Sequence, residues 1–186
     1  MLRRIVSYGL IAGLLVGVPL SVVTVGLNGH PPLRYGMVLG YTMMLIALST
    51  IFVAIKRHRD RDLGGVIRFW PAFGLGVGIS VVAGICYVVA WEAAVAIAHM
   101  DFASSYAAQV IAEQRAKGVS GEALAKVIAE MERFKVQYAN PLFRLPMVFA
   151  EIFPVGLLVS LVCAGLLRNS RFLPARPVTA ASRAGA

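Results

Sequence analysis

Four long apolar runs limit what this chain can fold into more than any other feature of its sequence. They occupy residues 5–27, 36–55, 73–98 and 145–167, and the charged residues gather in blocks between them. As a helix rising about 1.5 Å per residue, each run can cross a hydrocarbon core of about 30 Å. The runs lack the two-residue alternation of barrel strands and are about twice as long as such strands need. The sequence therefore predicts an all-α membrane protein with four transmembrane helices.

The first run follows Arg3 and Arg4 and could be mistaken for a secretory signal peptide. The apolar core of a signal peptide is only about 7–15 residues long. This run is longer, and no convincing cleavage site follows it. We therefore expect residues 5–27 to be retained as the first span.

The net charge of +9 is explained by where the basic residues lie. With four spans, the N-terminus, the second loop and the C-terminal tail share one side of the membrane, and almost all their charges are basic. The positive-inside rule places that side, with both termini, in the cytoplasm. Nucleic-acid binding is not expected, because no aromatic pattern or known motif accompanies the arginines. Five basic residues of the second loop are predicted to contact anionic lipid headgroups: Lys56, Arg57, Arg59, Arg61 and Arg68.

The segment between the third and fourth runs is the one sizeable part expected outside the membrane. Apolar residues recur at helical spacing in its first half, from Phe102 to Val110, and again from Leu124 to Tyr138. A Gly-Val-Ser-Gly turn separates the halves. We predict an extracytoplasmic helical hairpin over residues 101–139. It is either a plain connector or a lid or docking surface.

Glycines at helical spacing predict close contacts between helices. Gly9, Gly13 and Gly17 lie four residues apart in the first run and so fall on nearly one face. Small residues on one face let two helix backbones approach closely in a membrane. Gly74 and Gly78 form a similar pair in the third run. Packing within one chain is the preferred interpretation, and a seam in a homo-oligomer is the alternative.

Glu92 and Glu151 are the only charged residues that interrupt the four runs. A carboxylate inside a membrane costs at least about 3 kcal/mol, so it calls for a partner or a role. Counted from the outer ends of their spans, both glutamates lie six residues deep, roughly 9 Å. The sequence therefore predicts one intramembrane polar site at matching depth. The residues predicted to complete it are Tyr41, Thr42 and Ser21 in the same layer and His99 above it.

Two carboxyls in one apolar site should not both ionise, so they would share a proton. That chemistry suits a proton relay or a cation site, while the alternative is a purely structural hydrogen bond between helices. Pro154 should free the carbonyl of Ala150 beside Glu151, because proline clashes with the carbonyl four residues earlier. No metal site is predicted, since the acidic residues and His99 follow no ligand spacing. No cofactor is predicted either.

Three functions remain open. The preferred hypothesis is a small transport protein or a proton- or cation-coupled protein that uses the two glutamates. The second is a non-catalytic scaffold or accessory subunit that docks a membrane partner through the hairpin. A membrane-embedded enzyme comes third, because the sequence carries no serine-hydrolase, zinc-protease or nucleotide-binding motif.

Several blocks of the sequence point to a family. They are the run from Gly40 to Lys56, Arg59-Asp60, Leu63-Gly64-Gly65-Val66, Trp91-Glu92 and the run from Glu151 to Ser160. These blocks resemble a family of uncharacterised bacterial membrane proteins, domain of unknown function 4199 (DUF4199), over residues 5–167. The resemblance implies a four-span protein of the bacterial inner membrane and supplies no substrate. Residues 1–168 would form one transmembrane domain, and residues 169–186 are predicted to be a disordered basic tail.

Overall fold

The computed structural model describes residues 1–26 and 36–174 of the chain. These residues are mostly helical and contain no strand. The seven helices are α1 (Leu2–Gly26), α2 (Gly36–Leu48), α3 (Thr50–Asp62), α4 (Phe69–Ile97), α5 (Phe102–Ala116), α6 (Gly121–Tyr138) and α7 (Pro141–Leu167).

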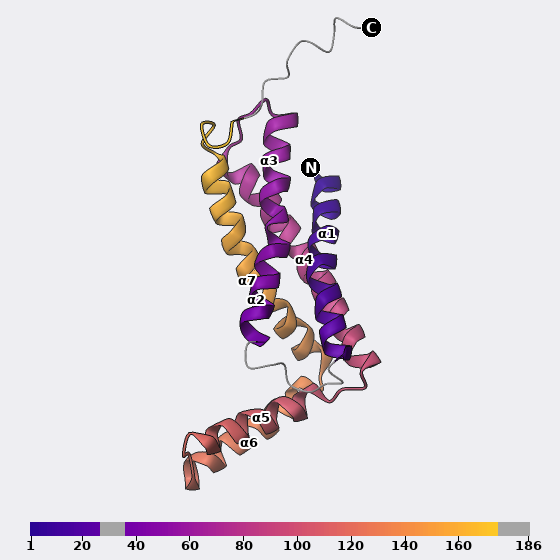
Figure 1. Ribbon diagram of the computed structural model, residues 1–186, viewed down its shortest axis with the longest axis vertical. Helices are drawn as coiled ribbons and strands as arrows, with labels where there is room; N and C mark the ends of the chain where they lie inside the picture. Colours follow the sequence, from indigo (N-terminus) through magenta and orange to yellow (C-terminus); the bar gives the residue numbers. More distant parts are fainter. Residues whose placement is uncertain (27–35, 175–186) are drawn as a thin grey trace, which may run out of the picture.

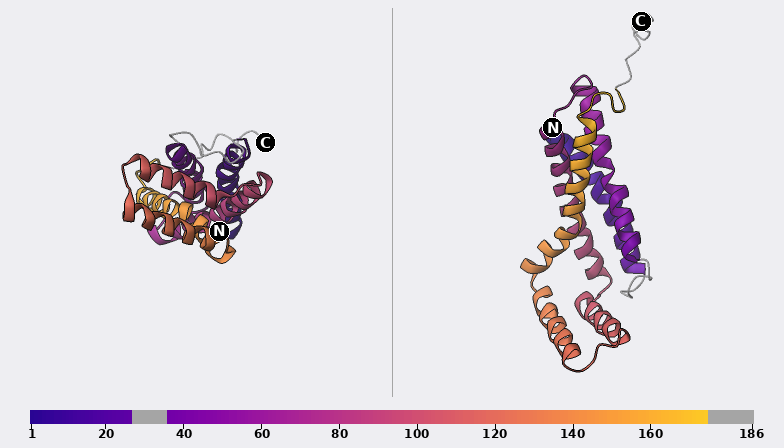
Figure 2. Two further views of the ribbon diagram at one scale, coloured as in Figure 1. Left: turned by 90° about the horizontal axis from the view of Figure 1, so that it is seen from below. Right: turned by 90° about the vertical axis from the view of Figure 1, so that its left-hand side faces the viewer.

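Four helical units are long and apolar enough to cross a membrane, namely α1, α2 together with α3, α4 and α7. They stand side by side as an elongated bundle, and α5 and α6 project from one end of it (Figures 1 and 2). We call that end the hairpin end. The N-terminus and the ends of α3 and α7 lie at the opposite end, which we call the basic end (Figure 1). The all-helical fold with four membrane-length helices is as predicted.

The second unit contains a break that its composition did not reveal. The sequence predicts one helix over residues 36–55, whereas α2 ends at Leu48 and α3 begins at Thr50. The Ser49 hydroxyl donates to the Ile46 carbonyl at 2.6 Å, and the Thr50 hydroxyl donates to the Ala47 carbonyl at 2.7 Å. Such bonds from adjacent serine and threonine side chains compete with the helical ladder and bend helices.

The fourth unit begins earlier than predicted. α7 starts at Pro141 rather than at residue 145, because the Asn140 side chain caps it by accepting a bond from the Leu142 amide at 3.0 Å. Proline fits the first helical position, where its missing N–H costs nothing. The early start places Arg144 on the helix instead of in a loop.

Helix α4 is the centre of the bundle and packs against α1 through small residues. A Cβ atom added at Gly9 would lie 2.5 Å from the Val82 Cβ. One added at Gly17 would lie 2.8 Å from the Ala90 Cβ, and Gly13 makes the tightest contact of the three, against Cys86. These glycines therefore meet α4 of the same chain.

The two glycines singled out in the third run differ from each other. Gly78 meets Ile5 of α1, since a Cβ there would lie 2.9 Å from the Ile5 Cδ1. Gly74 has open space around it, with no heavy atom within 4 Å of the place a Cβ would take.

The contact between α4 and α7 is reciprocal. A Cβ at Gly76 of α4 would lie 2.7 Å from the Ser160 hydroxyl, and one at Gly156 of α7 would lie 2.6 Å from the Ser80 hydroxyl. The two buried hydroxyls are 3.3 Å apart. Each helix thus carries the same Gly-x-x-x-Ser pattern of small residues, which is a signal for close helix packing.

The basic end is held by a buried arginine. Arg59 is fully buried, and its Nη1 and Nη2 donate to the Phe172 and Leu173 carbonyls at 2.9 and 2.5 Å. Its Nε donates to Asp60 at 2.7 Å. Arg59 therefore ties α3 to the turn after α7 and does not face lipid headgroups, which corrects the sequence prediction. A planar guanidinium satisfies several oxygens at once, and this accounts for its burial.

The other basic residues predicted to contact headgroups remain near the surface. Arg57, Arg61 and Arg68 are exposed, and Arg57 donates to the Tyr8 hydroxyl at 3.1 Å. Lys56 is partly buried and pairs with Asp60.

Candidate functional site

The hairpin end holds two layers of polar contacts between α4 and α7. In the outer layer, Arg144 of α7 donates two hydrogen bonds to Glu92 of α4, from Nε to Oε1 at 2.7 Å and from Nη2 to Oε2 at 2.6 Å. Both side chains are partly exposed. Two parallel charge-assisted bonds fix the geometry of such a pair as well as its charge.

The inner layer consists of Tyr87 and Glu151. The Tyr87 hydroxyl donates to the Glu151 Oε2 at 2.9 Å. Tyr87 is only 5% exposed, whereas Glu151 is exposed. Glu151 lies seven residues after Arg144, which at about 1.5 Å per residue puts it about 10 Å farther into the bundle.

The two glutamates therefore lie at different depths and take different partners. The sequence predicts matching depth, because it treats Arg144 as part of a loop. In the structure Arg144 belongs to α7 and lies level with Glu92. No hydrogen bond joins the two carboxyls in the part of the chain that is described, and a shared proton has no geometric support.

Two other residues of the predicted polar site form hydrogen bonds with backbone carbonyls instead of with the glutamates. The Thr42 hydroxyl donates to the Val38 carbonyl of its own helix at 2.7 Å. The Ser21 hydroxyl donates across the helix contact to the Ala90 carbonyl at 3.4 Å. Neither side chain bonds to a glutamate.

Tyr41 and His99 also stand apart from both carboxyls. Tyr41 is 49% exposed, and within residues 36–174 its hydroxyl has no hydrogen-bond partner. His99 is exposed just after α4, in a turn where its φ is +48°. Pro154 lies inside α7, three residues after Glu151. The described residues contain no group of His, Cys, Asp or Glu side chains able to hold a metal ion.

Five aromatic residues, which we call the ring cluster, dock the hairpin onto the bundle. They are Trp91 of α4, Phe102 and Tyr106 of α5, and Phe134 and Tyr138 of α6. The Trp91 indole donates to the Tyr138 hydroxyl at 2.9 Å, and its ring meets Phe102 edge-on with centroids 5.0 Å apart. Phe102 and Tyr138 lie 5.3 Å apart, and Tyr138 and Phe134 lie 5.4 Å apart. Edge and offset contacts of this kind stabilise beyond the area they bury.

Charges and a helix cap hold the hairpin at its base. The Arg144 guanidinium lies 5.7 Å from the centroid of the Tyr138 ring. Burial raises the pKa of Tyr138, so its hydroxyl stays neutral at physiological pH. The Asp101 side chain caps α5 by accepting a bond from the Ser104 amide at 3.0 Å, which lowers the pKa of Asp101. Asp101 is therefore ionised at neutral pH.

Replacing Tyr138 by Phe should loosen the hairpin. The change leaves the Trp91 indole without its partner, which costs about 1–2 kcal/mol. We expect faster amide hydrogen exchange in α5 and α6 and unchanged exchange in the centre of α4. Tyr106→Phe is the control, because the described residues offer its hydroxyl no hydrogen bond. Equal exchange in the two variants would contradict this role for Tyr138.

Sequence reasoning missed Tyr87, Arg144 and Tyr138 as partners at this site. A signal existed for Arg144. It immediately precedes the fourth run, and it lies at the same end of the predicted spans as Glu92. Tyr87 carried no such signal. An aromatic residue in an apolar helix is ordinary, and only the helix register shows that its hydroxyl meets Glu151.

Comparisons with known proteins fit this architecture. The profile of the family described as "Protein of unknown function (DUF4199)" matches residues 7–169 and confirms the resemblance noted in the sequence. No curated protein and no solved structure matches the chain. The matched region includes the two polar layers, the ring cluster, most of α1 and the whole of the other three membrane-length helices. The chain is thus a multi-pass membrane protein that belongs to the DUF4199 family.

Proposed function

We propose that this protein is a small proton- or cation-coupled transport protein in which Glu151 is the group that binds the ion. One observation supports the proposal: Glu151 is a carboxyl in an apolar, membrane-length helix and has no cationic partner among the described residues. Carboxyls in such positions are costly and mark ion pathways and proton relays.

The neighbours of Glu151 suit reversible binding. A tyrosine hydroxyl can donate to a carboxylate and accept from a carboxylic acid, so Tyr87 can bond to either form of Glu151. Glu151 lies on the outside of the bundle, so an ion that reaches its depth would bind without unpacking the helices. Glu92 differs, since the Arg144 guanidinium already neutralises its charge. In this proposal the outer pair holds α4 and α7 together above the binding carboxyl.

The proposal includes an orientation. The exposed basic residues at the basic end favour a cytoplasmic location for that end and for both termini, by the positive-inside rule. Arg57, Arg61 and Arg68 would contact anionic headgroups there, with Lys56 nearby. A bacterial inner membrane would have the hairpin on its outer face.

The test is substitution of Glu151 by Gln, which keeps size and hydrogen bonding but removes the titrating group. We expect proton or cation flux into proteoliposomes, followed with an entrapped pH dye or by isotope uptake, to fall about a hundredfold. The matched control is Glu113→Gln on α5, where the glutamate is exposed and paired with Lys117. Glu92→Gln should reduce flux less than Glu151→Gln. Wild-type flux in Glu151→Gln vesicles would rule the proposal out.

A second candidate function is that of an accessory subunit that docks a membrane partner through the hairpin. It is favoured by apolar side chains left open where α6 meets α7, with Val136 75% and Leu142 84% exposed. A photo-crosslinking residue at position 136 should then trap one defined partner in native membranes, while the same residue at position 117 should not. Identical products from both positions would count against this function.

A further inference from the structure

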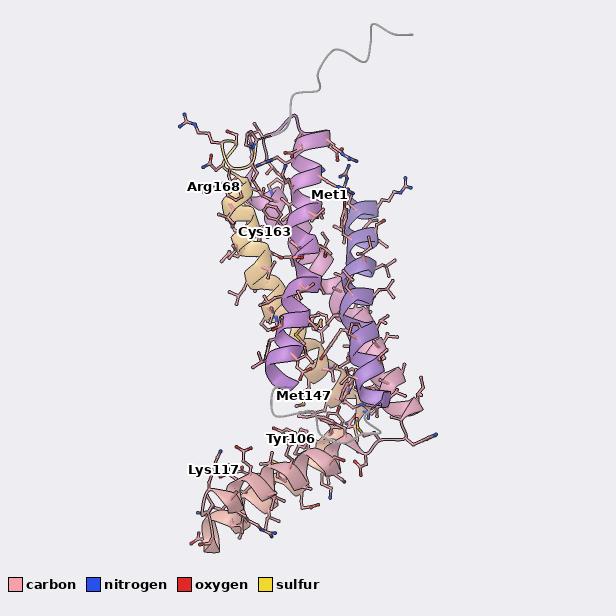
Figure 3. The ribbon with its side chains drawn as sticks, viewed as in Figure 1. Met1, Tyr106, Lys117, Met147, Cys163 and Arg168 are labelled. Atoms are coloured by element: carbon pink, nitrogen blue, oxygen red, sulfur yellow. The ribbon has the colours of Figure 1, made fainter. Side chains whose placement is uncertain are left out.

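An open cleft of about 400 Å³ lies at the base of the hairpin, where α4 ends and α7 begins. Val95 and Val136 form apolar parts of its wall, and Met100 adds a third. Figure 3 shows this junction between the labelled Tyr106 of the hairpin and Met147 of α7, with Lys117 at the far tip of the hairpin. The cleft is separate from Glu151.

Four charged side chains line the cleft, two of each sign: Asp101, Glu132, Lys135 and Arg144. Lys135 and Glu132 form only a long, partly exposed pair with a nitrogen–oxygen distance of 3.2 Å. Arg144 uses Nε and Nη2 on Glu92, while its Nη1 makes a single long contact of 3.4 Å with the Tyr138 carbonyl. An exposed pair such as Lys135–Glu132 contributes little to stability, so these two side chains can rearrange around a ligand.

The level of the cleft along the bundle indicates which ligand can reach it. α4 carries no charged residue between Arg68 and Glu92, and residues 69–91 rise about 35 Å as a helix. That length matches the hydrocarbon core with a small excess. The cleft begins just beyond Glu92 and Arg144, which places it in the headgroup layer.

We propose that this cleft binds a phospholipid whose headgroup carries both a phosphate and a primary amine. The phosphate would meet Lys135 and the Nη1 of Arg144, which makes only the long bond to the Tyr138 carbonyl, and the ammonium would meet Asp101 and Glu132. Val95 and Val136 would contact the start of the acyl chains. A quaternary amine lacks N–H donors and a glycerol headgroup lacks the positive charge, so both satisfy fewer of these groups.

Binding can be followed through Trp91, which contacts Phe102 and Tyr138 at the edge of the cleft. The chain has two tryptophans, and Trp70→Phe at the basic end leaves Trp91 as the single reporter. Detergent-solubilised protein is titrated with dihexanoyl phosphatidylethanolamine. We expect saturable fluorescence change, and Kd about tenfold higher in Lys135→Gln and in Asp101→Asn. Asparagine caps helices as well as aspartate, so the second variant keeps the cap on α5.

Lys117→Gln, which removes an exposed lysine at the tip of the hairpin, far from the cleft, is the control and should bind as the parent does. Three results would overturn the proposal. One is equal affinity for the phosphatidylcholine or phosphatidylglycerol analogue, which removes the headgroup selectivity. Another is equal affinity for free phosphoethanolamine, which points to a soluble ligand. The third is a Lys135→Gln variant indistinguishable from Lys117→Gln. None of these results bears on flux through Glu151.

Discussion

Replacing Arg59 by Ala is expected to lower the free energy of unfolding by about 3 kcal/mol, one of the two largest effects for a single substitution in this protein. The change leaves the carbonyls of Phe172 and Leu173 without their hydrogen-bond donor and removes one cation from Asp60. Buried groups that lose a charged partner destabilise by about 3–5 kcal/mol. The lower end applies here, because Lys56 still pairs with Asp60. Thermal unfolding in detergent, followed by circular dichroism, measures the loss.

Arg61→Ala is the matched control, since Arg61 lies on the same helix but is exposed. It should change stability by no more than about 0.5 kcal/mol. Arg59→Lys keeps the charge but not the planar fork, and it should fall between the two. If Arg59→Ala and Arg61→Ala unfolded at the same temperature, the buried bonds to the turn after α7 would be unimportant for stability.

Replacing Gly13 by Leu is expected to have an effect of similar size on the other side of the bundle. A Cβ at this position already collides with Cys86, so a full side chain must push α1 away from α4. Overpacking at a tight contact costs about 3 kcal/mol at the upper end of its range. The loss of stability can be measured by adding sodium dodecyl sulfate to the protein in a mild detergent and following its unfolding.

Gly74→Leu supplies the comparison with the same chemical change. The open space around Gly74 accepts a side chain, so this variant should stay within about 0.5 kcal/mol of the parent. Equal loss in both variants would show that helix propensity or insertion, rather than the contact with Cys86, sets the cost.

The candidate site shows where sequence reasoning reaches its limit. Glu92 and Glu151 were recognisable because a carboxyl in an apolar run is rare. The prediction that the two carboxyls lie at the same depth was wrong, because that depth depends on the residue at which α7 begins. A cap at Asn140 shifts that start by four residues, and Arg144 then becomes the partner of Glu92.

Arg59 shows the same limit for charge. In the sequence it is one basic residue among five in a loop, and the lipid-facing interpretation applied equally to all of them. Burial of one arginine requires several carbonyls to converge on it, and those carbonyls come from residues more than a hundred positions away. No local pattern encodes that convergence.

The sequence by itself determined the class of this protein and the count of its membrane-length helices: four apolar stretches long enough to cross a membrane, glycines spaced for close packing and an amphipathic pair between the last two spans. These features follow from hydrophobicity and helical period, which are local properties of the chain. The tertiary structure alone decided which glycine meets α1, which arginine is buried and which partner each glutamate takes. Those choices depend on the register between helices, and register is set by the packing of many small contacts at once.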